Sequence, residues 1–295
     1  MTYEIDNAVN LDQHSCFKNP DTYPDFQEHL KIFKKQLVKM VDNGESKTFY
    51  KFGDGEHYFL NRTHVGTASP GNRDLSKSYD EIKHEEFVDG VCKNDFITVE
   101  IYPENRAYFS ALYPERKIDF PAEYSYGLVA NKWLTKTFAG DLGIIGAKEK
   151  IDLIKIMMTK KEYQNYLGID KFEDYINIPQ KFVCDDIDET ERIVANQLEK
   201  SKSKIFLLGI GLVKSALLHR LKKYKDAIFL DVGSSIDALA GIIDHDRPYM
   251  GEWKNYRISG YDYSKLDTSV DYPHGEIVFD RDMDDIKRIN ALTRF

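Results

Sequence analysis

The chain has 295 residues, of which 42% are hydrophobic and 31% charged, a composition typical of a globular protein with a sizeable core. Its net charge of −8 argues against a protein that coats nucleic acid, although a metal or a local basic cluster would still allow an anionic substrate. The three cysteines lie far apart, which indicates neither a disulfide framework nor a zinc site. No apolar run could span a bilayer, and the first residues do not resemble a signal peptide, so we expect a cytoplasmic protein.

The N-terminal part begins with an irregular segment and continues as a helix and a strand. Residues 1–23 are expected to form an arm, and residues 24–295 a single α/β domain with a C-terminal loop and helix. Apolar residues at helical spacing predict a helix over residues 25–42. β-branched and aromatic side chains then predict a buried strand over residues 48–52.

An acidic, glycine-rich segment follows that strand directly. Gly53 and Gly55 allow the backbone to turn sharply and to approach a ligand closely. In an extended or gently turning backbone, Asp54 and Glu56 would point the same way and converge on one cation. Carboxylates are the ligands that Mg²⁺ and Mn²⁺ prefer, and these ions commonly accompany a diphosphate. The same residues also suit a surface turn, although the apolar residues 57–60 are unusual for an exposed hairpin tip.

Two candidate contacts for phosphate lie in the next part of the chain. Residues 67–73 read as a loop in which Asn72 and Arg73 would contact phosphate or sugar, with a solvated loop as the alternative. A helix over residues 75–92 and a strand over residues 96–102 follow. Arg106, just beyond that strand, would suit a diphosphate, and a surface ion pair is its simpler explanation.

The middle of the chain continues to alternate between helices and strands. The expected elements are helices over residues 128–138, 148–158 and 188–201, with Asp188 as N-cap of the last, and strands over residues 142–146 and 175–179. This alternation predicts an α/β fold with a mostly parallel sheet and helices on both faces.

The most regular unit is a strand–turn–helix–strand over residues 204–231. Gly209 and Gly211 form a turn where free backbone N–H groups favour an anion, although tight packing of helix on strand explains these glycines equally well. Lys214 stands where the third glycine of the dinucleotide fingerprint would fall, so NAD binding is only weakly indicated.

A second strand-end site follows the unit at Asp231, Gly233, Ser234 and Ser235. These hydroxyls either contact a ligand or cap the next helix. In a parallel sheet, Asp54 would share one edge with Gly209 and Asp231, which makes a common site plausible.

The C-terminal part is expected to cover that edge. Residues 244–269, with Trp253 and a cluster around His245, suit a long loop or lid over an acceptor. A helix over residues 282–292 would end the chain. A single histidine such as His245 is more often structural than catalytic.

Three segments together resemble the GT-D-type glycosyltransferases over residues 45–240. They are Phe52-Gly53-Asp54-Gly55-Glu56, Leu207-Leu208-Gly209 and Asp231-Val232-Gly233-Ser234-Ser235-Ile236-Asp237. The most specific part is the Asp-x-Glu motif of Asp54 and Glu56, which would match the metal-binding and donor-binding pair of the family. This chain departs from the family at Lys51, where an arginine is usual, and at the two serines, where we associate a Gly-His pairing with bacterial members.

The resemblance implies a Rossmann-like fold and the transfer of a sugar from a nucleotide-diphosphate donor, with a UDP-sugar as the first expectation, to a hydroxyl acceptor such as a glycan. Mn²⁺ or Mg²⁺ held by Asp54 and Glu56 would stabilise the leaving diphosphate. The expected donor-binding set comprises Gly53, Gly55, Arg73, Gly209, Gly211, Asp231, Gly233, Ser234 and Ser235. Asp237 is a candidate base that nothing in the sequence selects over its neighbours.

Several points stay open at this stage. A metal-dependent phospho- or nucleotidyltransferase would use the same paired carboxylates, and a non-catalytic nucleotide-binding module would share the glycine turns. A homodimer is an expectation without a sequence motif behind it. The resemblance extends to viral proteins, for which the cytoplasm would be that of the host.

Overall fold

A seven-stranded sheet forms the centre of the protein in the computed structural model, which describes residues 26–63, 75–242, 256–258, 261–263 and 266. The strand order is β3-β2-β1-β7-β6-β4-β5, and every neighbouring pair is parallel. The prediction of a Rossmann-like α/β fold with helices on both faces is therefore confirmed. The sheet is entirely parallel.

The strands are short, and the central ones are almost fully buried, as expected for a parallel sheet that is covered on both sides. Their bounds are β1 (Lys47–Phe52), β2 (Phe96–Val99), β3 (Phe120–Pro121), β4 (Leu142–Ala147), β5 (Asp174–Ile178), β6 (Ile205–Gly209) and β7 (Ile228–Asp231). Successive side chains of a strand point to opposite faces, so Phe49 packs in one core and its neighbours Tyr50 and Phe52 pack in the other.

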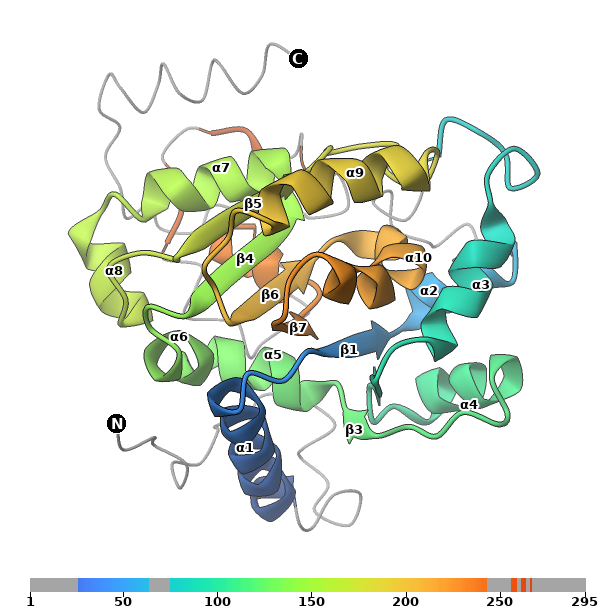
Figure 1. Cartoon of the computed structure of the whole chain (residues 1–295), viewed down its shortest axis with the longest axis horizontal. Helices are drawn as coiled ribbons and strands as arrows, with labels where there is room; N and C mark the ends of the chain where they lie inside the picture. Colours follow the sequence, from blue (N-terminus) through green and yellow to red (C-terminus); the bar gives the residue numbers. More distant parts are fainter. Residues whose placement is uncertain (1–25, 64–74, 243–255, 259–260, 264–265, 267–295) are drawn as a thin grey trace.

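Each face of the sheet is covered by its own set of helices (Figure 1). One set comprises α1 (Phe26–Asp42), α5 (Glu123–Ala130), α6 (Trp133–Thr137), α7 (Lys148–Met157), α8 (Lys161–Leu167) and α11 (Ser235–Leu239). The other comprises α2 (Asp54–Leu60), α3 (His84–Cys92), α4 (Pro103–Leu112), α9 (Ile187–Leu198) and the helical run η3 (Gly211–Val213), α10 (Lys214–Leu217) and η4 (Leu218–Lys223).

Several predicted helices are wrong in extent. The helix expected from residue 75 begins only at His84, and the one expected over residues 128–138 is split by Lys132, whose φ is +66°. The helix expected over residues 212–224 is a series of three short helical segments.

Other element boundaries also differ from the prediction. The strand expected over residues 96–102 ends at Val99, and Arg106 lies inside helix α4 rather than beyond a strand end. Asp188 is not the N-cap of α9, because Asp186 accepts the backbone N–H of Glu189 at 3.0 Å. Helices α2 and α8 were not predicted.

Some predicted features fall outside the described residues. These are the N-terminal arm, Asn72 and Arg73, most of the lid segment including His245 and Trp253, and the final helix over residues 282–292. Within the part of the chain that the structure describes, no helix combines the length and apolar character needed to cross a membrane.

The carboxyl ends of the strands all lie at one edge of the sheet because every pair is parallel. Strand β1 ends just before Asp54, β6 ends at Gly209 and β7 ends at Asp231. The predicted common edge is therefore confirmed for these three positions.

Candidate functional site

The glycine-rich acidic segment forms the start of a helix rather than an extended corner. Gly53 is the extended N-cap residue, with φ −142° and ψ −171°, and helix α2 begins at Asp54. Side chains two residues apart on a helix of 3.6 residues per turn point to nearly opposite sides. The expectation that Asp54 and Glu56 point the same way is therefore wrong: Asp54 is exposed, whereas Glu56 is 8% exposed.

Glu56 uses both of its carboxylate oxygens inside the protein. Its Oε2 accepts the backbone N–H of Gly53 at 2.8 Å, as an acid in the first turn of a helix often does for the N-cap residue. Its Oε1 lies 3.3 Å from Nζ of Lys214. A methyl group on Gly53 would lie 3.3 Å from Oε2, so a glycine at this position leaves room for the carboxylate.

Asp231, at the end of β7, is almost completely buried, at 1% exposure. Its Oδ1 accepts the N–H of Gly233 at 3.0 Å, and its Oδ2 accepts the N–H of Lys51 at 3.0 Å. The same Oδ2 lies 2.8 Å from Nζ of Lys214. Asp231 thus ties the end of β7 to β1 and to the turn before α11, and it has no surface to offer a ligand directly.

Lys214 lies between the two buried carboxylates. It is 4% exposed, and its ammonium contacts Glu56, Asp231 and the ring of Tyr50, whose centroid is 5.3 Å from Nζ. Burial raises the pKa of Tyr50 well above its ordinary value, and the charge of Glu56 adds to the effect. The Tyr50 hydroxyl therefore stays protonated and forms a hydrogen bond of 2.8 Å with Ser215.

A second lysine connects the ends of β1 and β2. Nζ of Lys51 lies 2.9 Å from Oε1 of Glu100, whose other oxygen accepts a hydrogen bond from Asn105 at 2.8 Å. The stem of Lys51 passes over Gly233, where a methyl group would lie 3.4 Å from its Cδ. The edge therefore carries cations as well as acids.

The two glycines of the late turn differ in what they do. A methyl group on Gly209 would lie 2.6 Å from the carbonyl oxygen of Gly233 and 2.6 Å from Cβ of Ile236, so close packing requires this glycine. Gly211 has φ +59° and open space around it, so here the backbone conformation favours glycine. Gly55 is buried within helix α2.

The predicted serines and the candidate base lie at the start of α11. Ser234 is the N-cap residue, but its side chain makes no capping hydrogen bond, so the alternative of a serine cap is wrong for this residue. Ser235 is 1% exposed, and its Oγ has no hydrogen-bond partner within the described part of the chain. Asp237 is paired with Lys150 of helix α7, with 2.7 Å between Oδ1 and Nζ.

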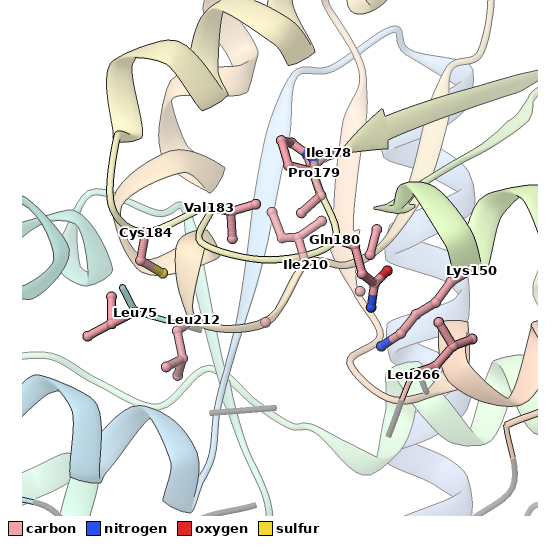
Figure 2. A pocket seen from close by; sticks show the side chains of 13 residues that line it. Leu75, Lys150, Ile178, Pro179, Gln180, Val183, Cys184, Ile210, Leu212 and Leu266 are labelled. Atoms are coloured by element: carbon pink, nitrogen blue, oxygen red, sulfur yellow. The ribbon is translucent and has the colours of Figure 1, made fainter. Parts of the chain in front are cut away.

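A pocket opens at the same edge, beyond the ends of β4, β5 and β6, with a cavity volume of about 90 Å³. The chain leaves β4 toward one face of the sheet and leaves β6 toward the other, and crevices of this kind bind ligands in α/β proteins. Figure 2 shows Lys150 and Gln180 at one side of the pocket, and Leu75, Cys184 and Leu212 at the other. The backbone of Gly209 and Gly211 forms part of the wall.

The residues present do not fit a divalent cation held jointly by Asp54 and Glu56. The oxygens of Glu56 are taken by Gly53 and Lys214, and Asp54 points elsewhere, with its Oδ1 accepting the N–H of Gly55 at 2.8 Å. Within the described residues no three acidic, histidine or cysteine side chains gather as a set of metal ligands. Metal dependence therefore stays a prediction.

The structure thus assembles part of the predicted site and adds residues to it. Glu56, Asp231 and the two late glycines lie together at one edge, whereas Arg73 lies outside the described residues. Lys214 and Lys150 were not predicted as site residues. The sequence does carry a signal for Lys214, because a lysine within an apolar run after a glycine turn is unusual.

Comparisons with known proteins add little to this picture. A scan against protein-family models finds no match, and a search of the curated proteins finds none. Among solved structures, the chain is similar to one described as a new glycosyltransferase from Streptococcus sanguinis, with 11% identity and a TM-score of 0.44. The similarity covers 70% of this chain and 81% of that chain. A likeness of this size carries no argument, so the proposals below rest on the residues of this chain.

Proposed function

We propose that the protein is a glycosyltransferase that moves a sugar from a nucleotide-diphosphate donor to a hydroxyl acceptor. The observation that carries the proposal is the pocket at the carboxyl edge of the sheet, the edge at which the three segments that resemble the GT-D-type enzymes also lie and which Gly209 of one of them helps to line. The pocket, the glycine turn and the acidic segment come from distant parts of the chain and meet at one edge.

The two sides of the pocket suit the two parts of a nucleotide. Leu75 and Leu212 offer an apolar surface to a flat base, while Lys150 and Gln180 lie where a phosphate or ribose would be held. Its volume of about 90 Å³ is below the roughly 300–1,000 Å³ typical of pockets that enclose a whole ligand, so it would hold only part of the donor.

Lysines supply the charge that an anionic donor needs in a chain with a net charge of −8. Among the described residues, Lys150 is the lysine that lines the pocket, with 19% of its side chain exposed. Breaking the sugar–phosphate bond leaves a nucleoside diphosphate, whose growing negative charge an ammonium stabilises. A phosphate that took Lys150 as its partner would also release the carboxylate of Asp237, which we propose as the acceptor of the proton from the incoming hydroxyl.

A panel of nucleotide sugars in a thermal-shift assay tests donor binding. A donor at about 100 times its Kd stabilises the native state by about 2.7 kcal/mol, because it binds only the folded chain, and a UDP-sugar is the expected ligand. Lys150→Ala should abolish the shift. Lys148→Ala is the matched control, because Lys148 lies on the same helix and pairs with Asp152 away from the pocket.

The product then identifies the reaction. Release of a nucleoside diphosphate with the acceptor glycosylated supports the proposal. Release of a nucleoside monophosphate or pyrophosphate would indicate the rival phospho- or nucleotidyltransferase instead. Binding without any turnover, across a range of acceptors and with Mn²⁺ or Mg²⁺ present, would leave only a nucleotide-binding module.

A further inference from the structure

The ammonium of Lys214 is the cation that balances two buried carboxylates at the sheet edge. Glu56 and Asp231 each direct one oxygen at its ammonium, at 3.3 and 2.8 Å. The remaining oxygens accept backbone N–H groups, from Gly53 to Glu56 and from Gly233 to Asp231. Every oxygen of the two side chains therefore already has a partner, and Lys214 occupies the space between them.

The burial of Lys214 makes its removal from this position costly. Its side chain is 5% exposed, and it follows Leu212 and Val213, which are buried in the apolar core. An ammonium taken out of water persists only when it is paired and hydrogen-bonded. The ring of Tyr50 lies against the ammonium, with its centroid 5.3 Å from Nζ. A divalent ion would have to displace the ammonium of Lys214 from both of its carboxylate partners. No other carboxylate forms an ion pair with Lys214 within the described residues.

We propose that the ammonium of Lys214 takes the place of a divalent cation between Glu56 and Asp231, so that the native chain has no metal site at this pair. Removing the ammonium would leave two buried carboxylates facing a space that a hard cation fills, and Mn²⁺ is a suitable probe because it prefers such oxygen ligands. The inference stands apart from the proposed sugar transfer, since it concerns metal binding by the chain alone.

The test measures Mn²⁺ binding to the full chain after treatment with a chelator and desalting. Electron paramagnetic resonance counts the bound ions, and a thermal melt with and without Mn²⁺ reports whether they stabilise the fold. In the wild type we expect no Mn²⁺ site that depends on Glu56. Lys214→Ala should gain one site per chain, at least about tenfold tighter than any site of the wild type, together with a higher melting temperature in Mn²⁺.

Two further variants make the result specific. Lys214→Ala combined with Glu56→Gln should lose the new site. Lys222→Ala is the matched control: Lys222 comes from the same helical run and pairs with Asp95 at 2.7 Å, so its removal should create no site that depends on Glu56.

The proposal is overturned in either of two ways. A wild-type Mn²⁺ site that Glu56→Gln abolishes would show that a metal displaces the ammonium, and this measurement needs no variant of Lys214. A folded Lys214→Ala variant that gains no site would also overturn it. If the alanine variant does not fold, Lys214→Met keeps the aliphatic stem and serves the same test. Failure of sugar transfer would change neither outcome.

Discussion

Two acids of one short segment have opposite surroundings. The carboxylate of Glu56 is buried against Gly53 and Lys214, whereas Asp54 at the first position of the same helix is exposed. Replacing one acid at a time therefore separates the contribution of the buried carboxylate from that of the exposed one.

Replacing these acids one at a time should change stability very unequally. Glu56→Gln breaks a buried charge pair and should lower the free energy of unfolding by about 2–4 kcal/mol. Asp54 is exposed, so Asp54→Asn should change the free energy of unfolding by less than about 0.5 kcal/mol. Urea unfolding of both variants measures the difference. An equal loss in both would contradict the burial described for Glu56.

Gly209 is a second residue whose role can be tested by one methyl group. Gly209→Ala would place Cβ 2.6 Å from the backbone oxygen of Gly233, which cannot rotate away as a side chain can. We expect a loss of about 1–3 kcal/mol, as for other overpacked sites. Gly146→Ala is the control, since its Cβ would meet only side-chain atoms at 3.2 Å and should cost less. Equal stability of Gly209→Ala and the wild type in urea would refute the packing role.

At the level of elements, the N-cap of α9 is a feature that the sequence alone does not determine. Asp186 and Asp188 are both acids at the start of an apolar periodic run, and composition alone does not choose between them. In the folded chain the N-cap is Asp186, whose Oδ1 accepts the N–H of Glu189. Asp188 instead pairs with Lys83 at 2.6 Å on the surface.

The cap can be verified by a pair of alanine variants. Asp186→Ala should lower stability by about 1 kcal/mol, because one N–H of the first turn loses its acceptor. Asp188→Ala removes a surface ion pair with Lys83 and a longer contact of 3.7 Å with Arg220, and should cost less than about 0.5 kcal/mol. Thermal or urea unfolding compares the two variants. A larger loss of stability in Asp188→Ala than in Asp186→Ala would indicate that Asp188 is the N-cap instead.

Six of the seven strands of the sheet were predictable because apolar runs mark buried strands of a parallel sheet clearly, whereas β3, only two residues long, was not predicted. Strands β1, β4 and β6 lie within a residue or so of their expected positions. Helix α2 escaped prediction because two glycines in three residues favour a turn on local grounds, and the packing of Phe59 and Leu60 overrides that preference. The ion pair between Lys214 and Asp231 depends on the order of the strands in the sheet. No local sequence pattern encodes that order, so the pair could not be predicted.

For the whole molecule, His219 links stability to pH. Burial lowers the pKa of His219 to about 4, with the charges of Arg220, Lys93 and Lys223 adding to the effect and Glu191 opposing it. Its Nδ1 has no hydrogen-bond partner in the part of the chain that the structure describes. The unfolded chain binds a proton at this residue below pH 6.5, and the folded chain does so only near pH 4.

Stability should therefore fall as the pH is lowered from 6.5 toward 4, and the contribution of His219 is fully present above that window. We expect a loss of about 1–2 kcal/mol from this half-buried group after allowance for solvent. Urea unfolding at several pH values, compared with His219→Gln, isolates the effect. A pH profile that is the same for both proteins would exclude His219 as the cause.

The position of β7 has a consequence for how the chain is made. It is the last strand along the described part of the chain, yet it pairs with β1 on one side and β6 on the other, and its Asp231 accepts the backbone N–H of Lys51 from 180 residues away. Until a ribosome has released this segment, the nascent polypeptide holds two half-sheets with an open seam between them, one ending at β1 and the other at β6. Synthesis of β7 closes that seam, so the continuous seven-stranded sheet and the contact between Lys214 and Asp231 both form late.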